Sequence, residues 1–310
     1  MSQLLRRATS PGADGATVAI DPSTEPPGLG GVGWRWISFA AHELAPGAVV
    51  RRSGDGREVG VVVLEGAVRV RAGGRVFGEL GSRASVFEPI PAPVLLVEPG
   101  VSLEVEALGS ARIALAGAPG GDLRQTRLIE SASMRVEARG SGQTARTVRH
   151  LLPPDVAAGR LILVEVLTPG GNWSSYPPHK HDVEDQPHES QLEELYYYRF
   201  AKPQGFAFQR VYTADRSLDE AVTPMDGDAV LVPRGYHPVG APAGYDCYYL
   251  NVMAGPSRLW HFTLDPDHAW LMDWDPQAPR RRPTAGDLHG RRHRSAARED
   301  GEDDADGVLE

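Results

Sequence analysis

Cysteine is nearly absent from this chain, and no segment looks like an export signal. The single cysteine, Cys247, cannot form an internal disulfide, the cross-link that is common in oxidising compartments. The first 15 residues include two arginines but no apolar segment and no small-residue cleavage pattern, so no secretory signal is recognisable. A cytoplasmic location is therefore the default expectation.

Long apolar runs and an excess of positive charge are also missing. Apolar runs such as residues 59–68 are far shorter than the ~20 residues that a helix needs to cross a bilayer. We therefore expect a soluble chain without a membrane partner. The formal net charge is −9 and the arginines are scattered. Because phosphate backbones are bound by a basic face, no nucleic-acid partner is expected.

The sequence does contain many short β-branched segments that end at glycine or proline. It has 35 glycines and 26 prolines, and these residues interrupt two series of such segments, over residues 34–118 and 160–254. Short strands at this spacing, with no helical period of useful length, are typical of sandwiches and barrels. The predicted fold class is all-β, with two copies of one small barrel in the chain.

Changes in composition predict the domain boundaries. Residues 276–310 run from basic to acidic without an apolar face, so a disordered tail is predicted there. The segment at 126–150 is polar and contains glycine, which is typical of a connection. The expected order is an N-terminal extension (1–33), a first barrel (34–125), the connection (126–150), a second barrel (151–275) and the tail (276–310).

Histidines distinguish the two predicted barrels. None lies between His42 and His150, whereas six lie within the second barrel, namely His179, His181, His188, His237, His261 and His268. An imidazole site can therefore belong only to the second barrel. We expect the first barrel to lack a metal and to serve as a scaffold that covers one face of the second.

The segment YPPHKHD places His179 and His181 two positions apart. On a strand such residues share a face, so both imidazoles can point inward while Lys180 points outward. Neutral imidazoles with a carboxylate form a site for a divalent first-row metal, with positions left open for substrate. A histidine pair of this kind can also be a simple surface feature. However, Glu194 before an aromatic strand and His237 after a Gly/Pro turn lie downstream and can complete such a site.

Several long segments resemble one known family. The order of two histidines, a glutamate and a third histidine resembles the metal motif of the cupin superfamily. More narrowly, the chain over about residues 34–275 is similar to the 5-deoxy-glucuronate isomerase family of myo-inositol breakdown. The segments that carry this resemblance are YPPHKHD, LEELYYYRF, GFAFQRVYT, VLVPRGYHPVGAPAGYDCYYLNVMAGP and DPDHAW.

The resemblance implies a fold, a cofactor and a reaction. Members are bicupins, with two barrels in one chain and the metal in the C-terminal barrel. The resemblance therefore implies one divalent ion, which could be zinc, manganese, iron, nickel or cobalt. Its ligands would be His179, His181, Glu194 and His237. The implied reaction is the aldose–ketose conversion of 5-deoxy-glucuronate to 5-dehydro-2-deoxy-gluconate. The expected partner is thus a small sugar acid, and a homo-oligomer is possible.

The spacing of the glutamate differs from the usual cupin motif, where it lies a few residues after the second histidine. Here thirteen positions separate His181 from Glu194, so the intervening segment is predicted to be a longer hairpin loop. Glu194 is preferred because it immediately precedes the aromatic strand, on which its neighbour Glu193 must face the other way. The rival ligands within or beside the loop are Glu184, His188, Glu189 and Glu193.

The implied reaction needs a proton removed beside the aldehyde and returned to the neighbouring carbon. A divalent ion would stabilise the developing negative charge as a Lewis acid. We expect the catalytic groups among Glu194, Tyr196 and Tyr248. Tyr198, Tyr249 and a water on the metal are further candidates for the proton carrier, and the sequence does not choose among them.

The substrate carboxylate requires a cation at the far end of the pocket. Arg210 is the first choice, since a guanidinium binds a carboxylate with two hydrogen bonds. Gln209 and Tyr198 are the other predicted substrate-binding residues, although Gln209 and Arg210 must face opposite ways on a regular strand. The weaker arginine candidates are Arg199, Arg234 and Arg258.

Two other functions are compatible with the same motif. A cupin with three histidines and a carboxylate can host iron chemistry with dioxygen, so a metal-dependent oxygenase is one alternative. A non-catalytic sugar-acid binding protein is the other. A nicotinamide or flavin enzyme is not expected, since no Gly-rich strand-to-helix motif is present.

Overall fold

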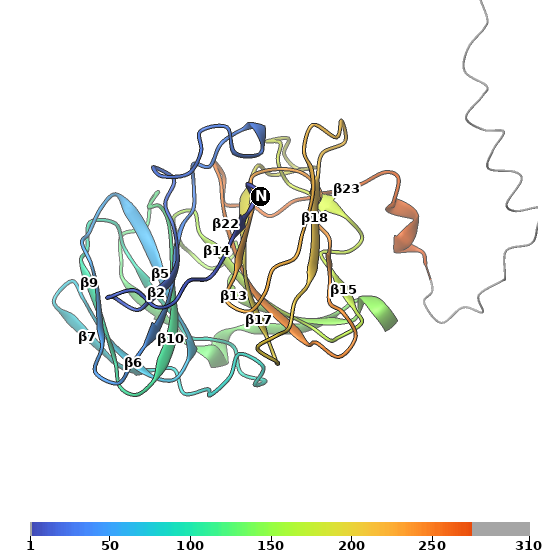
Figure 1. Ribbon diagram of the computed structural model, residues 1–310. Coiled ribbons are helices and arrows are strands. Elements are labelled where there is room, and N and C mark those ends of the chain that lie inside the picture. Colours follow the sequence, from blue (N-terminus) through green and yellow to red (C-terminus); the bar gives the residue numbers. More distant parts are fainter. Residues whose placement is uncertain (1, 275–310) are drawn as a thin grey trace, which may run out of the picture. The chain divides into compact units, whose positions relative to one another are not determined.

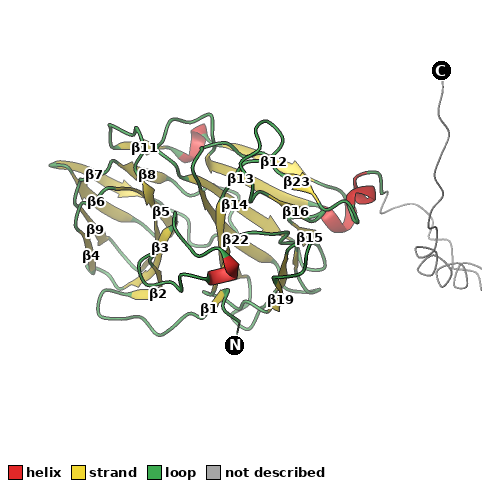
Figure 2. Cartoon of the chain, turned by 90° about the horizontal axis from the view of Figure 1, so that it is seen from above, coloured by secondary structure: helices red, strands yellow, loops and turns green. Residues whose placement is uncertain are grey.

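The computed structural model describes residues 2–274, and these residues form an all-β chain. Figure 2 shows strands and loops with only short helical turns between them. The predicted disordered tail at 276–310 lies outside the described residues. Among residues 2–274, no helix has the length and apolar character that a membrane span requires. The short helical turns are η1 (Leu29–Gly31), η2 (Ser131–Ser133), η3 (Gly142–Thr144) and η4 (Ala269–Met272).

The first barrel consists of two antiparallel sheets (Figure 1). The six-stranded sheet has the order β11-β8-β5-β10-β3-β2, and the four-stranded sheet has the order β4-β9-β6-β7. The strands are β2 (Ala16–Ile20), β3 (Ser38–Leu44), β4 (Val49–Arg52), β5 (Arg57–Glu65), β6 (Val68–Ala72), β7 (Arg75–Leu80), β8 (Val94–Val97), β9 (Leu103–Ala107), β10 (Ala111–Pro119) and β11 (Arg127–Ile129).

The interior of the first barrel is filled by apolar side chains. On β5, Val61 and Val63 belong to this inner cluster, whereas Val62 and Leu64 belong to the cluster that includes the core of the second barrel. Because successive side chains on a strand point to opposite faces, β5 is buried on both sides. This explains why its sequence is a continuous apolar run rather than an alternating one.

The second barrel is built in the same way. Its seven-stranded sheet has the order β1-β20-β17-β22-β14-β13-β12, its four-stranded sheet the order β15-β21-β18-β19, and β16 pairs with β23. The strands are β1 (Leu5–Arg6), β12 (Arg135–Arg139), β13 (Arg146–Leu152), β14 (Ile162–Thr168), β15 (Trp173–Ser174), β16 (His179–Lys180), β17 (Glu193–Phe200), β18 (Phe208–Tyr212), β19 (Asp219–Val222), β20 (Ala229–Val232), β21 (Val239–Gly240), β22 (Cys247–Ala254) and β23 (Thr263–Leu264). The all-β, two-barrel architecture expected from the sequence is confirmed.

The domain boundaries differ from the predicted ones. Strand β1 lies in the second barrel and β2 in the first, so residues 1–33 are more than an extension. The predicted connection at 126–150 contributes β11 to the first barrel and β12 with most of β13 to the second. Strand β12 is a largely exposed edge strand. Its polar composition, which suggested a connection, follows from that exposure.

A buried ionic cluster joins the two barrels. Glu165 on β14 is fully buried and accepts hydrogen bonds from Arg83 of the first barrel at 2.5 Å and from Tyr248 at 2.8 Å. Arg149 lies 3.4 Å from the same carboxylate. Burial opposes ionisation, but the two guanidinium groups and the tyrosine hydroxyl hold the pKa of Glu165 below its ordinary value.

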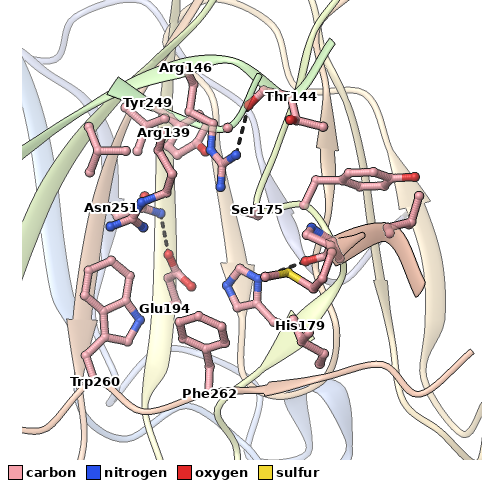
Figure 3. A pocket seen from close by; sticks show the side chains of 18 of the residues that line it. Arg139, Thr144, Arg146, Ser175, His179, Glu194, Tyr249, Asn251, Trp260 and Phe262 are labelled. Atoms are coloured by element: carbon pink, nitrogen blue, oxygen red, sulfur yellow. Dashed lines mark hydrogen bonds between the residues drawn. The ribbon is translucent and has the colours of Figure 1, made fainter. Parts of the chain in front are cut away.

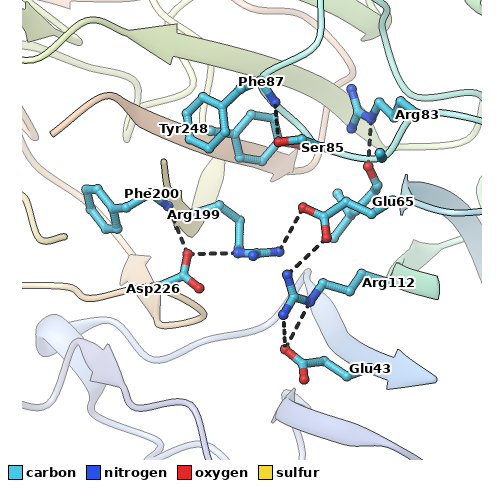
Figure 4. Close-up of polar contacts among 12 residues, drawn as sticks. Glu43, Glu65, Arg83, Ser85, Phe87, Arg112, Arg199, Phe200, Asp226 and Tyr248 are labelled. Carbon is cyan, nitrogen blue, oxygen red and sulfur yellow. Dashed lines mark hydrogen bonds and ion pairs between the residues drawn. The ribbon is translucent and has the colours of Figure 1, made fainter. Parts of the chain in front are cut away.

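A second bridge between the barrels involves Arg199 of β17 (Figure 4). Its guanidinium donates to Asp226 at 2.8 Å and to Glu65 of the first barrel at 3.4 Å. Arg112 of β10 contacts the same Glu65 at 2.9 Å. These contacts hold β17, which carries Glu194 at its other end, against the first barrel.

Candidate metal centre and cavity

Three histidines converge inside the second barrel. His179 lies on β16, His181 is the first residue after that strand, and His237 lies in the turn between β20 and β21. Their nitrogen atoms lie within 4.8 Å of one another. The imidazole of His237 lies between the other two, with ring centroids 5.0 Å from each.

A backbone carbonyl orients each of the three imidazoles. The Nδ1 atom of His179 lies 3.2 Å from the carbonyl oxygen of residue 177, that of His181 lies 3.1 Å from residue 192, and that of His237 lies 2.8 Å from residue 235. A carbonyl only accepts hydrogen bonds, so Nδ1 carries the proton and Nε2 keeps its lone pair. This is the arrangement in which a histidine binds a metal through Nε2.

Glu194 completes the cluster from the start of β17. Its Oε2 atom lies 2.9 Å from His181 Nε2 and 3.0 Å from His237 Nε2, while Oε1 accepts a hydrogen bond from Asn251 at 2.5 Å. Burial opposes ionisation of Glu194, but His237 and His181 hold its carboxyl pKa well below the ordinary value. Burial and the other two imidazoles lower the pKa of His179 to about 3. The cluster thus combines a neutral imidazole at His179 with an ionised carboxylate at Glu194.

These residues fit a divalent cation. An unprotonated Nε2 and a carboxylate oxygen are both acceptors, so a positive charge must lie between them where they approach within 3 Å. Burial lowers the pKa of His181, but the carboxylate of Glu194 raises it, and the net shift is upward. The carboxylate thus favours a positive charge at Nε2. His237 Nε2 is buried and makes no hydrogen bond within the described part of the chain. Three imidazoles and one carboxylate are a donor set that suits divalent first-row metals.

The rival ligands lie elsewhere. Glu193 faces the other side of β17 and accepts hydrogen bonds from the backbone N–H groups of Arg35 and Trp36. Burial raises its pKa to about 7, although those N–H groups favour the ionised form. Glu189 binds Lys180 at 2.7 Å, Glu184 accepts from the backbone N–H of residue 191, and His188 is exposed. The alternation along β17 thus brings Glu194 to the histidines and turns Glu193 away.

A cavity of about 430 Å³ opens beside the histidines (Figure 3). His179 and Glu194 line it, and Glu194 is the one carboxylate among the described lining residues. Tyr196, whose hydroxyl lies 2.9 Å from Ser175 Oγ, lines the same wall. Other lining residues are Arg139, Arg146, Tyr176, Tyr249, Asn251, Trp260, Phe262 and Met272.

Two arginines of this wall were not among the sequence-derived candidates. Arg139 on β12 and Arg146 on β13 are directly opposite each other in the strand register. The segment was interpreted as a connection, so its residues were not considered for the barrel wall. The signal available in the sequence was the alternation of charged and apolar residues over 135–139, which is compatible with a strand that has one polar face.

Comparison with known proteins agrees with the resemblance found in the sequence. The model of the KduI/IolB family matches residues 4–271. A 5-deoxy-glucuronate isomerase from Geobacillus kaustophilus is 44% identical over 273 residues, which cover 88% of this chain and 96% of the relative. The chain belongs to the KduI/IolB family. A 5-deoxy-glucuronate isomerase from Listeria monocytogenes is 46% identical over 279 residues, covering 89% of this chain and all of that relative.

Solved structures support the same assignment. An IolB-like protein from Salmonella typhimurium is 41% identical and superposes with a TM-score of 0.82, covering 87% of this chain and 99% of the other. Oxalate decarboxylase from Lactobacillus farciminis is 14% identical with a TM-score of 0.59, covering 89% and 91%. The second likeness concerns the fold alone. This KduI/IolB family member has the predicted fold of two cupin-type barrels.

The candidate tyrosines of this KduI/IolB family member lie on different faces of their strands, and only some of them line the cavity. Tyr196 lines the cavity, but Tyr248 does not, because its hydroxyl binds Glu165 on the side facing the first barrel. Tyr248, one of the expected catalytic residues, therefore lies away from the cavity. Its neighbour Tyr249 points the opposite way and lines the cavity. Tyr248 and Tyr249 are both buried, so the hydrophobicity of the sequence could not show which of the two faces the cavity.

The predicted substrate-binding residues are also away from the cavity. The guanidinium of Arg210 is 44% exposed, binds Asp219 with two hydrogen bonds of 2.7 Å and lies over the ring of Tyr212. Gln209 and Tyr198 bind each other at 2.8 Å inside the barrel. None of these three lines the cavity. Strand β18 belongs to the four-stranded sheet, whereas the arginines of the cavity come from β12 and β13.

The weaker arginine candidates have other partners. Arg199 joins the two barrels, and Arg234 donates to the carbonyl oxygen of Gly30 at 2.6 Å. Arg258 donates to backbone carbonyls, including that of residue 161 at 2.7 Å. Each therefore has a role in packing.

Proposed function

We propose that this chain is a metal-dependent aldose–ketose isomerase that converts 5-deoxy-glucuronate to 5-dehydro-2-deoxy-gluconate in myo-inositol catabolism. The observation that carries the proposal is the convergence of three imidazoles and Glu194 at the wall of a cavity large enough for a small sugar acid. The names of the relatives support the choice of substrate. A cytoplasmic location and a homo-oligomeric state stay predictions.

In this proposal His179, His181, His237 and Glu194 hold one divalent ion. When bound, the ion would supply Lewis-acid stabilisation of negative charge on the carbonyl and hydroxyl oxygens of the substrate. The donor set of nitrogen and oxygen suits zinc, manganese, iron, nickel or cobalt. The carbonyl groups that bind each Nδ1 keep the imidazoles oriented, so the site needs little rearrangement.

The proposed proton carrier is Glu194. The reaction moves one proton from C2 of the aldose to C1 and a second from the C2 hydroxyl to the aldehyde oxygen, without net loss of electrons. Glu194 is the one carboxylate among the described residues of the cavity wall, and its Oε1 is held by Asn251. Burial raises the pKa of Tyr249 to about 12 and that of Tyr196 well above its ordinary value. Both hydroxyls therefore stay protonated near neutral pH and serve as donors to the developing oxyanion.

Adjacent tyrosines on β22 provide a matched test of this assignment. Tyr249→Phe is expected to lower kcat by roughly 100-fold, the lower end of the effect of losing an oxyanion donor. Tyr248→Phe should leave kcat and KM unchanged and lower the free energy of unfolding by about 1–3 kcal/mol, because Glu165 loses a buried donor. Steady-state kinetics and urea unfolding measure the two effects. The reverse pattern would refute the assignment of the cavity face.

The activity itself is tested with purified, metal-loaded protein and 5-deoxy-glucuronate. The expected result by NMR is loss of the aldose C1 proton signal and appearance of the ketose, with no oxygen consumed. Oxygen uptake that depends on the sugar acid would instead indicate an oxygenase. Binding without turnover, at full metal occupancy, would indicate a sugar-acid binding protein. Either result would overturn the proposed reaction.

A further inference from the structure

Two arginines lie side by side in the cavity wall, in an arrangement that is unfavourable by itself. Arg139 on β12 and Arg146 on β13 are directly opposite in the antiparallel register. Like charges in such a pair destabilise a sheet unless something neutralises them. Glu137 forms an ion pair with Arg139, so one of the two charges has a partner within the protein.

Among the residues that the structure describes, Arg146 has no such partner. Its guanidinium donates a hydrogen bond to the carbonyl oxygen of Thr144 at 2.9 Å, and no carboxylate among residues 2–274 forms an ion pair with it. Burial lowers the pKa of Arg146, and neighbouring Arg139 acts in the same direction. By contrast, exposed Arg210 is fully paired with Asp219. A half-buried guanidinium that faces a cavity and has no ion-pair partner in the described part of the chain is suited to a ligand anion.

The position of Arg146 relative to the histidines indicates which part of the substrate is the anion that it would bind. Figure 3 shows Arg139 and Arg146 entering the cavity from one side, with Glu194 and His179 farther along the wall. The proposed substrate is an open six-carbon chain with an aldehyde at one end and a carboxylate at the other. One molecule can therefore place its aldehyde at the histidines and its carboxylate at the arginines.

We infer that Arg146, with Arg139 beside it, binds the carboxylate of the substrate and makes the enzyme selective for sugar acids over neutral sugars. This inference rests on the proposed function for the identity of the substrate. The guanidinium can donate two parallel hydrogen bonds to the carboxylate, which fixes the end of the chain that does not react. Holding that end orients C1 and C2 toward Glu194 and the imidazoles.

The kinetic test compares two substrates and three proteins. The substrates are 5-deoxy-glucuronate and 5-deoxyglucose, in which a hydroxymethyl group replaces the carboxylate. For Arg146→Ala we expect kcat/KM for the sugar acid to fall about 10- to 100-fold, which is the effect of losing a hydrogen bond to a charged group. The value for the neutral sugar and the metal content should not change. Arg210→Ala, the matched control, should leave both substrates unaffected.

If Arg146→Ala lowers kcat/KM equally for the two substrates, Arg146 has only a structural role and the inference fails. An unchanged kcat/KM for the sugar acid would also overturn the inference. Arg146→Lys keeps a cation and should retain part of the preference, which protects the test against misfolding of the alanine variant. Calorimetric binding of D-glucuronate and D-glucose provides a readout without turnover. If the wild type prefers the acid, loses this preference in Arg146→Ala and yet isomerises nothing, the proposed reaction fails while the anion site stands.

Discussion

Replacement of His181 by alanine is expected to abolish metal binding and isomerase activity while leaving the fold intact. His181 Nε2 is one of three converging imidazole nitrogens and lies 2.9 Å from Glu194. Loss of a direct ligand should exceed the roughly 10- to 100-fold cost in metal affinity that follows from removing a supporting partner of a ligand. Metal content by mass spectrometry of the purified protein, together with turnover of 5-deoxy-glucuronate, measures the effect.

His188→Ala is the matched control, because His188 is exposed in the loop between His181 and Glu194. This variant should keep full metal occupancy and turnover. Circular dichroism should show the same strand signal in both variants, since the first barrel has its own apolar interior. Full occupancy in His181→Ala would remove His181 from the ligand set. Undiminished turnover by demonstrably metal-free protein would overturn the Lewis-acid mechanism even if the substrate is right.

Replacement of Glu165 by alanine is expected to destabilise the protein by about 3–5 kcal/mol, the usual effect of breaking a buried ion pair. Glu165 is fully buried and neutralises both Arg83 and Arg149 between the barrels. Its removal leaves two buried guanidinium groups with no carboxylate partner among the described residues. The shift of the first transition in urea unfolding measures the loss.

Glu104→Ala is the control for this prediction. Glu104 pairs with Arg51 and Arg71 on the outside of the first barrel, where all three side chains are partly exposed. Exposed ion pairs contribute about 0–1 kcal/mol because water screens them and the side chains lose rotamer freedom. If Glu165→Ala and Glu104→Ala lower the free energy of unfolding by similar amounts, burial of the Glu165 cluster does not increase its contribution to stability.

The alternation of strand residues made part of the candidate site predictable. His179 and His181 are two positions apart, and Glu194 differs from Glu193 only in strand face, so a local rule was enough to select among them. The histidine distribution then assigned the site to the second barrel. In the structure the three histidines lie within 4.8 Å of one another, and Glu194 contacts two of them. Each of the four residues lies on or beside a strand of the second barrel.

The substrate side of the cavity was not predictable in the same way. Strands β17 and β22 are buried along their whole length, since one face lines the second barrel and the other meets the first. Hydrophobicity therefore could not tell Tyr249, which faces the cavity, from Tyr248, which faces Arg83. Arg139 was missed because the exposed edge strand β12 has the polar composition of a loop. Arg146 lies on the inner strand β13 and was missed because residues 126–150 were predicted to be a connection.

Strand periodicity and long, specific motifs were enough to predict the fold class, the family and a candidate set of metal ligands from the sequence. The tertiary structure was needed to show which buried tyrosine faces the cavity and which arginine has no ion-pair partner among residues 2–274. Both properties depend on neighbours that are distant in the sequence. Arg210 is neutralised by Asp219 across β18 and β19, whereas Arg146 faces another arginine across β12 and β13, and strand pairing alone creates that difference.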